Sequence, residues 1–151
     1  MKSLINNIKI GAKILIKGKE YTVKTKTWYS IYEDNTVSYI KCVLSNNKTL
    51  LIIPSENLIY LDEEIDSNKY KELSENEILY KNTVFKLIGE GHQFIKNIEF
   101  GDINQIEGEC IYKNYEADGN NISLGILPDK GNIRADVFSR LISYNDIKII
   151  N

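Results

Sequence analysis

The chain has 151 residues, of which 42% are hydrophobic and 26% are charged, and its formal net charge is -2. A chain of this length can bury a sizeable core without disulfides or a metal, and its composition is typical of folded rather than disordered proteins. The 19 Lys and Arg side chains form no patch or stripe along the sequence. Their spread argues against a nucleic-acid partner and against a polybasic membrane anchor.

Cysteine usage and the apolar runs favour a cytoplasmic location. The two cysteines, Cys42 and Cys110, lie far apart and indicate reduced, buried thiols rather than a disulfide framework. Near the start, Asn6 and Asn7 interrupt the chain before an apolar stretch of signal-peptide length can form. The longest aliphatic run, residues 50–53, is far too short to cross a bilayer. We therefore expect no secretory signal and no transmembrane segment.

Period-two alternation predicts a β-meander in the first part of the chain. Apolar side chains alternate with other residues over positions 8–16, and a β-branched and aromatic run follows the turn at Gly18 and extends towards Trp28. Further strands are expected at residues 37–44 and 49–53, and Pro54 ends the second of these. This meander defines a first β half, residues 1–61.

A polar, acidic stretch at residues 62–78 is interpreted as a connector, with a short helix or an edge strand as alternatives. It leads to a second β half, residues 79–151. There, Gly89 and Gly91 mark a turn or bulge, and Asp118-Gly119 predicts a hairpin. No stretch sustains a helical apolar stripe. The remaining strands are expected at residues 83–88, 92–100, 109–115, 122–127, 133–138 and 147–150.

Three short matches between the halves indicate an internal duplication, although short matches in a β-rich sequence also arise by chance. They recur in the same order at similar spacing. The expected fold is therefore mainly β, with little helix and two related barrel-like or curled antiparallel sheets. The matches pair residues 18–21 with 91–94, Cys42-Val43 with Cys110-Ile111, and Ile53-Pro54 with Leu127-Pro128.

Motifs for metal, nucleotide or nucleophilic chemistry are missing from the sequence. The one histidine, His92, carries no ligand spacing and favours a structural role. The Gly-x-Gly at residues 89–91 precedes a strand rather than a helix, so it does not fit a phosphate cradle. The acidic run at residues 62–66 lacks the spaced ligands of a calcium loop. We expect no cofactor, no metal site and no enzymatic activity.

Aromatic residues are the one feature above background. Core and cross-strand packing explain such residues in most sheets, but at loop edges they supply the rigid contact area typical of protein interfaces. They cluster around the first long loop and recur in the matching region of the second half. The candidate binding residues are Trp28, Tyr29, Tyr32, Tyr39, Tyr112 and Tyr115.

Several segments share a pattern: a Gly-x-x-Tyr hairpin within residues 11–23, a strand at 39–44 that ends in Leu, and a Tyr-containing strand at 107–115 before Asp118-Gly119. This pattern resembles the bacterial family known as domain of unknown function 4178. The family has no established activity, so the resemblance implies no catalytic residue and no cofactor. It implies a bacterial cytoplasmic protein that works near membrane-stress machinery.

Two functional hypotheses follow. The first is a noncatalytic binding or adaptor module that contacts a protein partner through its aromatic loop edges, with a homo-oligomer left open. The rival is a small-molecule-binding protein or enzyme with a site between the two halves. In that case His92 is one candidate, and Glu107 with Glu109 is another, because residues two apart share one face of a strand. A true duplication also predicts that Cys42 and Cys110 lie on equivalent strands.

Overall fold

The computed structural model describes residues 1–30, 38–99 and 108–150, the last five residues of the middle range by backbone alone. Strands dominate these residues, which confirms the mainly β class with little helix. The strands are β1 (Lys13–Ile16), β2 (Lys19–Ser30), β3 (Tyr39–Leu44), β4 (Lys48–Ile53), β5 (Leu58–Glu64), β6 (Tyr70–Ser74), β7 (Glu77–Tyr80), β8 (Thr83–Glu99), β9 (Gly108–Ala117), β10 (Asn120–Leu127), β11 (Ile133–Arg134), β12 (Val137–Ile142) and β13 (Ile147–Ile149). The helical elements are α1 (Lys2–Asn7) and the 3-10 turns η1 (Ser45–Asn47), η2 (Pro54–Glu56), η3 (Ser67–Lys69), η4 (Pro128–Lys130) and η5 (Tyr144–Asp146).

The described strands form one antiparallel sheet in place of the two sheets expected from the sequence. Its hydrogen-bonded order is β13-β1-β2-β3-β4-β5-β12-β10-β9-β8-β7-β6, with β11 beside β10. Strand β12, from the second half, lies between β5 and β10, and β13 pairs with β1. The late strands therefore complete the sheet of the first half, which is why the halves do not form separate sheets.

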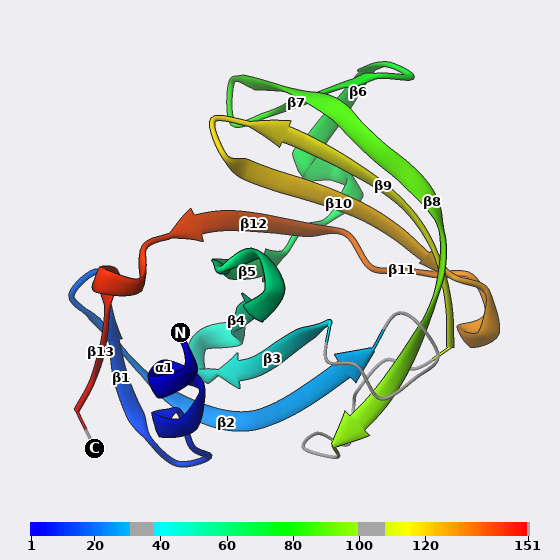
Figure 1. Ribbon diagram of the computed structural model, residues 1–151. Helices are drawn as coiled ribbons and strands as arrows, with labels where there is room; N and C mark the ends of the chain where they lie inside the picture. The colour runs from blue at the N-terminus through cyan, green and yellow to red at the C-terminus, as the bar shows by residue number, and fades with distance from the viewer. Residues whose placement is uncertain (31–37, 100–107, 151) are drawn as a thin grey trace.

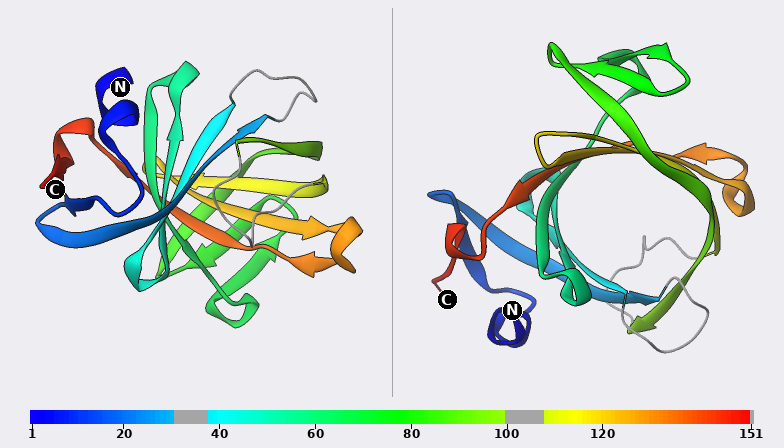
Figure 2. Two further views of the ribbon diagram at one scale, coloured as in Figure 1. Left: turned by 90° about the horizontal axis from the view of Figure 1, so that it is seen from below. Right: turned by 45° about the horizontal axis from the view of Figure 1, so that its top comes forward.

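The sheet curls until its two long strands meet (Figures 1 and 2). Strand β2 pairs with β3 and also with β8, where Tyr29 lies opposite Asn97. Register shifts interrupt β2 between Val23 and Thr25 and β8 between Leu87 and Gly89, and such bulges bend a strand and increase its twist. The shift at Gly89 confirms the bulge alternative there, since β8 runs on without a turn. The curl gives the sheet a convex and a concave face.

The first hydrophobic core lies on the convex face, beneath α1, β1 and β13, which sit outside the curl (Figure 2). Alternate residues of β3, β4 and β5 point into this core. The Lys26 ammonium donates to the carbonyl oxygens of Ile5 and Ile8 at the end of α1, which holds the helix on the sheet. Its buried members are Leu4, Ile8, Ile14, Ile16, Tyr21, Val23, Ile40, Cys42, Leu44, Leu50, Ile52, Ile59 and Ile142.

A second convex core lies beneath the β6–β7 hairpin, on the opposite side of the curl (Figure 2). It joins β7 and β8 to β9, β10 and β12 through packed aromatic rings, such as Tyr80 and Phe138 with centroids 5.1 Å apart. The buried members are Ile78, Tyr80, Phe85, Tyr115, Ile122, Leu124 and Phe138. Both of these hydrophobic cores therefore lie outside the curl, and the concave face has a different composition.

The predicted hairpin turn is present, but the first half begins and ends differently from the prediction. Asp118 and Gly119 both have positive φ, 53° and 81°, which confirms the predicted hairpin. The strand expected from residue 8 begins only at Lys13, because α1 and a turn occupy the preceding residues. The stretch 62–78 holds the end of β5, all of β6 and the start of β7.

Only one of the three repeat matches has the same local structure in both halves. Ile53-Pro54 and Leu127-Pro128 each end a strand and open a 3-10 turn that closes on a left-handed residue, Asn57 or Gly131. Gly18 sits in a turn whereas Gly91 lies within β8. Cys42 belongs to the first convex core, whereas Cys110 packs with Tyr29 and Leu127. The cysteines are therefore not equivalent, and the structure does not show an internal duplication.

Candidate functional site

A row of polar residues crosses the concave face from one half of the chain to the other. Opposed residues of an antiparallel pair point to the same face, so the register defines the row step by step. Thr25 lies opposite Val43, Val43 opposite Thr49, and Thr49 opposite Asp62. Asp62 in turn lies opposite Ser139, and Ser139 opposite Asn121. We call Thr25, Val43, Thr49, Asp62, Ser139 and Asn121 the concave row.

A second line of residues runs beside the concave row on the same face. Thr27 lies opposite Lys41, Lys41 opposite Leu51, and Leu51 opposite Tyr60. Because alternate residues of a strand share a face, Thr27 is the neighbour of Thr25 and Tyr60 the neighbour of Asp62. This line places an ammonium group and a phenol next to the carboxyl of the row.

Asp62 is the charged centre of the concave row. Only 7% of the residue is exposed. Burial raises the pKa of Asp62 from 3.8 to about 6, while a hydrogen bond from Ser139 and the charge of Lys41 act in the opposite direction. The carboxyl therefore changes its charge close to neutral pH.

Four buried oxygen atoms of this region have no hydrogen-bond partner within the described part of the chain: Thr25 Oγ1, Thr27 Oγ1, Asp62 Oδ1 and Asn121 Oδ1. All four belong to the concave row or to the line beside it. Buried polar atoms in native proteins are nearly always hydrogen-bonded, and each one left unpaired costs about 1–3 kcal/mol. These atoms have almost no exposed surface, so they keep a hydrogen-bonding capacity that no described group of the chain uses.

An aromatic cluster closes one end of the concave face. The rings of Tyr29 and Tyr39 are stacked, with centroids 5.1 Å apart. They pack with residues of β9 and β10, so the cluster joins opposite sides of the curl. Burial raises the pKa of Tyr39, and the neighbouring Tyr29 and Cys110 add to that rise. The members of this aromatic cluster are Tyr29, Tyr39, Cys110, Tyr112, Leu127 and Ala135.

Lys41 lies between the polar and the aromatic parts of the face. Its positive charge lowers the pKa of Asp62 and also that of Cys110, although burial outweighs it at both groups. A single ammonium therefore acts on the concave row and on the aromatic cluster. The face combines Lys41 and the titratable Asp62 with several hydroxyls and an aromatic wall. The register continues it beyond Asn121 to the exposed Glu116 and Lys86.

The structure brings together three of the predicted binding residues, Tyr29, Tyr39 and Tyr112, in the aromatic cluster. Trp28 points to the opposite face, where it packs against the first core and the Lys26 Nζ atom lies 4.6 Å from its ring centroid. Tyr115 is buried in the second core. Tyr32 lies outside the described residues. The role of these aromatics in binding a protein partner stays a prediction.

Two of the residues proposed for the rival enzyme, His92 and Glu109, do not lie on the concave face. The His92 Nε2 and Glu109 Oε2 atoms are 3.6 Å apart, and their side chains are 58% and 46% exposed. His92 lies opposite the exposed Ile111, whereas its neighbour Gln93 lies opposite Cys110 of the aromatic cluster. His92 and Glu109 therefore belong to the solvent side of β8 and β9. Glu107 lies outside the described residues.

The sequence did not single out the residues of the concave row. Asp62 begins an acidic run that favours a solvated face, and threonines are common on strands. The one available signal was alternation, since Tyr60 and Asp62 alternate with the apolar Ile59 and Leu61. That pattern marks a second face of the strand, but not its burial, which depends on the curl of the whole sheet.

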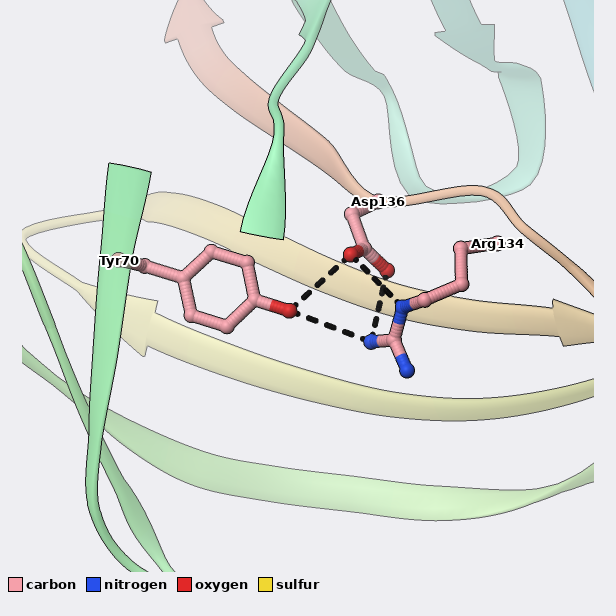
Figure 3. Close-up of polar contacts among 3 residues, drawn as sticks. All are labelled: Tyr70, Arg134 and Asp136. Carbon is pink, nitrogen blue, oxygen red and sulfur yellow. Dashed lines mark hydrogen bonds and ion pairs between the residues drawn. The ribbon is translucent and has the colours of Figure 1, made fainter. Parts of the chain in front are cut away.

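A separate polar network fixes the β6–β7 hairpin to the region before β12 (Figure 3). The Asp136 carboxylate accepts hydrogen bonds from Tyr70 Oη at 3.0 Å and from Arg134 Nε at 3.1 Å. Arg134 Nη2 also donates to Asp136 Oδ1 and to Tyr70 Oη, both at 3.2 Å. The Asp136 side chain is only 3% exposed, and its partners satisfy both carboxylate oxygens. This closed network is explained by packing.

Two open hollows occur on the described surface away from the concave row. One of about 430 Å³ lies beside Leu58 and Tyr144, and one of about 250 Å³ lies between Leu73 and Tyr115. Neither is lined by a buried charged side chain. Within the described residues, no three His, Cys, Asp or Glu side chains gather in a way that could hold a metal ion.

No family model, curated protein or solved structure matches this chain. The resemblance to the domain of unknown function 4178 therefore stays a prediction. In the described ranges, no helix has the length and apolar character needed to cross a bilayer.

Proposed function

We propose that this chain is a noncatalytic small-molecule-binding protein whose site is the concave face between the two halves. The observation that carries the proposal is the set of four buried, unpaired oxygen atoms on that face. These atoms have almost no exposed surface, so a ligand would reach them by opening the curl. The hydrogen-bond partners that it then supplies would remove the desolvation cost of these atoms.

The division of the concave face supports the same function. Ligand sites combine mostly apolar or aromatic walls with a small number of polar groups. Here the aromatic cluster supplies the wall, and Lys41, Asp62 and the threonines supply the polar groups. The first half contributes β2 to β5 and the second half contributes β9, β10 and β12, so the site depends on both.

A thermal-shift screen of a metabolite library on the full chain tests this function. A ligand present at about 100 times its dissociation constant stabilises the native state by about 2.7 kcal/mol, which raises Tm by roughly 5–10 °C for a domain of this size. Thr27→Val keeps the side-chain volume but removes an unpaired hydroxyl. It should abolish the shift or shrink it strongly.

The matched control is Thr83→Val, the same change at the start of β8, outside the concave face. This variant should respond to each ligand as the unmodified chain does. A screen without any ligand, or ligand shifts that are equal in both variants, would argue against a site on the concave face.

The adaptor role expected from the sequence is the second candidate function, and one surface favours it. Phe94 and Ile111 are diagonal neighbours on the strands β8 and β9, and they are 37% and 47% exposed. Exposed apolar side chains that gather on one surface are typical of contact sites. Ile111→Lys should then remove proteins that co-purify with the chain, and Thr83→Val should not.

The loop-edge form of the adaptor hypothesis uses Trp28 and Tyr32. Replacing both with Ala should remove co-purifying partners, and unchanged recovery of partners would contradict this form of the hypothesis.

A cytoplasmic location remains part of our proposal. It is supported by the two free thiols, Cys42 and Cys110, since reducing compartments keep cysteines in that form.

A further inference from the structure

We propose that the curl opens reversibly: the sheet separates where β2 meets β8, with β12 as the hinge, and water or a ligand then reaches the concave row. This inference rests on the proposed function, because it names the motion that admits a ligand to the same site. The motion itself can be measured without a ligand.

The two convex cores divide the described chain into two packed bodies. The first body holds the first core, to which α1 and β1 to β5 contribute, and the second body holds the second core, to which β7 to β10 contribute. Among the described strands, β12 alone has buried side chains in both, Ile142 in the first core and Phe138 in the second. A strand packed into both bodies keeps them together while the angle between them changes, which is the role of a hinge.

Hydrogen bonds outside the strand ladder strengthen the hinge side. Just before β12, the Asp136 carboxylate binds Tyr70 of the second body (Figure 3). The neighbouring Ala135 N–H donates to the Gly125 carbonyl oxygen at 2.9 Å. At the other end of β12, the Leu141 N–H donates to Asn120 Oδ1 at 3.0 Å. These bonds join β12 to the second body, so they remain when β2 and β8 separate.

The opposite side of the curl is held by the contact between β2 and β8. Residues 28–30 pair there with residues 96, 97 and 99, and a register shift interrupts the pairing. Neither convex core contains buried side chains from both β2 and β8. The aromatic cluster does join the bodies here, since Tyr29 and Tyr39 come from the first body and Cys110 from the second. Separation at this contact therefore breaks the aromatic cluster and leaves both larger cores packed.

The polar atoms of the concave face favour opening. Thr25 Oγ1, Thr27 Oγ1, Asp62 Oδ1 and Asn121 Oδ1 are buried without a partner in the described part of the chain. Opening lets water bond these atoms, and their hydration offsets part of the packing that the aromatic cluster loses. Thr27 lies two residues before Tyr29 on the same face of β2, next to the contact that breaks. The closed form is therefore less favoured than its packing alone would make it, as local opening requires.

Solvent already reaches the same face beyond the concave row. Glu116 lies opposite Asn121, and Lys86 lies opposite Glu116. Both Glu116 and Lys86 are exposed. The buried Asn121 is thus one strand away from exposed residues of its own line, so a small separation of the bodies extends the exposed part of the face to the row.

The two native thiols report the opening in the unmodified full chain. Cys110 belongs to the aromatic cluster, so opening exposes it, whereas Cys42 lies in the first core and is exposed only when the first body unfolds. The chain is treated with an excess of a water-soluble thiol reagent, and peptide mass spectrometry assigns the labelled sites. We expect Cys110 to react at least about tenfold faster than Cys42.

Tyr39→Ala weakens the contact, because it removes one ring of the stacked pair that Tyr39 forms with Tyr29. It should accelerate the labelling of Cys110 by about tenfold or more and leave Cys42 unchanged. The matched control is Tyr144→Ala, the same change at an exposed tyrosine of η5, which should alter neither rate. Circular dichroism and Tm first establish that each variant folds.

A reversible cross-link separates opening from simple exposure of Cys110. Ser30 lies opposite Lys96. Opposed residues of an antiparallel pair have Cα atoms about 4.5–5.5 Å apart, within the range that a disulfide spans. The double variant Ser30→Cys/Lys96→Cys should label at Cys110 at least about tenfold more slowly when oxidised than when reduced. In the oxidised form, adding Tyr39→Ala should no longer accelerate the labelling.

Equal labelling rates of Cys110 and Cys42 in the unmodified chain would overturn the inference, as would labelling of Cys110 that the disulfide does not slow. If the disulfide does not form, the Tyr39→Ala comparison decides, and equal acceleration of both thiols would overturn the inference. The proposed function fails separately. Opening without any Thr27-dependent ligand in the screen would refute the site alone, whereas such a ligand that binds the oxidised and reduced forms equally would refute the opening alone.

Discussion

Asp62 of β5 and Ser139 of β12 face each other across one of the strand pairs that join the two halves of the chain, and the Ser139 hydroxyl hydrogen-bonds the Asp62 carboxyl. The buried carboxyl of the concave row therefore depends on a residue more than half the chain away. Any change at this pair should affect both the pH dependence of folding and the ligand site.

The first prediction concerns the pH dependence of stability. Burial raises the pKa of Asp62 to about 6 in the folded chain, against 3.8 for the free group. Between these values the native state holds more protons than the unfolded state, so the contribution of Asp62 to stability falls as pH rises. The contribution is full below about pH 4 and is lost above about pH 6, and the total change is about 3 kcal/mol.

Asp62→Asn removes this titration. Both proteins are unfolded with urea at several pH values between about 4 and 7. As pH rises, the unfolding free energy of the variant should increase relative to that of the unmodified chain, by about 3 kcal/mol across the range. Glu90→Gln, at an exposed carboxylate 3.9 Å from Lys113, is the control and should leave the pH profile unchanged. Parallel profiles for Asp62→Asn and the unmodified chain would contradict the prediction.

The second prediction concerns the network of Tyr70, Arg134 and Asp136. Arg134→Ala leaves the buried Asp136 carboxylate with Tyr70 as its remaining side-chain donor, so we expect a loss of about 1–3 kcal/mol in unfolding free energy. Hydrogen exchange should increase in β6 and β7, which the network fixes to the sheet. Lys113→Ala breaks an exposed ion pair and should change stability by less than about 1 kcal/mol. Equal effects of the two changes would show that the network does not stabilise the hairpin.

The third prediction compares two glycines without positive φ. A Cβ atom on Gly125 would lie 3.0 Å from the Ala135 carbonyl oxygen and 3.6 Å from Cys110 Sγ, whereas one on Gly89 would meet nothing within 4 Å. Gly125→Ala should therefore destabilise the chain by about 1–3 kcal/mol, because the backbone of a packed region must move. Gly89→Ala should change stability by less than about 0.5 kcal/mol. Thermal unfolding measures both, and a tolerated Gly125→Ala would contradict the close packing of β10 on the segment after β11.

The fourth prediction concerns the thiols. Burial raises the pKa of Cys42 to about 12 and also raises the pKa of Cys110, so both should react slowly with a water-soluble thiol reagent in the native state. The two sites differ, however, because Cys42 lies in the first core and Cys110 faces the concave side. A ligand of the concave face should slow the labelling of Cys110 and leave Cys42 unaffected, as peptide mass spectrometry can measure. Equal protection of both thiols would indicate a general tightening of the fold.

Local features of this fold were predictable, because short-range chemistry determines them. The positive φ values at Asp118 and Gly119 follow from the residue types alone, and the alternation around β3 and β4 assigned their positions closely. The insertion of β12 beside β5 was not predictable, because the pairing of Ile142 with Ile59 depends on contacts across most of the sequence. Without that insertion, two sheets were the simpler interpretation.

The candidate site was harder to predict than the fold. Trp28 and Tyr29 are adjacent aromatic residues, yet Trp28 packs on the convex face and Tyr29 on the concave face. Asp62 looks like any other residue of its acidic run until the curl buries it. Sequence patterns separate the two faces of a strand, but the identity of the enclosed face follows only from the strand order and the bulges in β2 and β8.

The placement of β13 beside β1 also affects how the chain reaches its native state. Ile14 lies opposite Ile149, so a strand near the start of the sequence gains its second neighbour from residues made about 130 positions later. Contacts of such large sequence separation slow folding, and the unpaired edges of β1 and β5 stay available to other chains in the meantime. During synthesis, the first core should therefore remain incomplete and prone to aggregation until β12 and β13 have emerged.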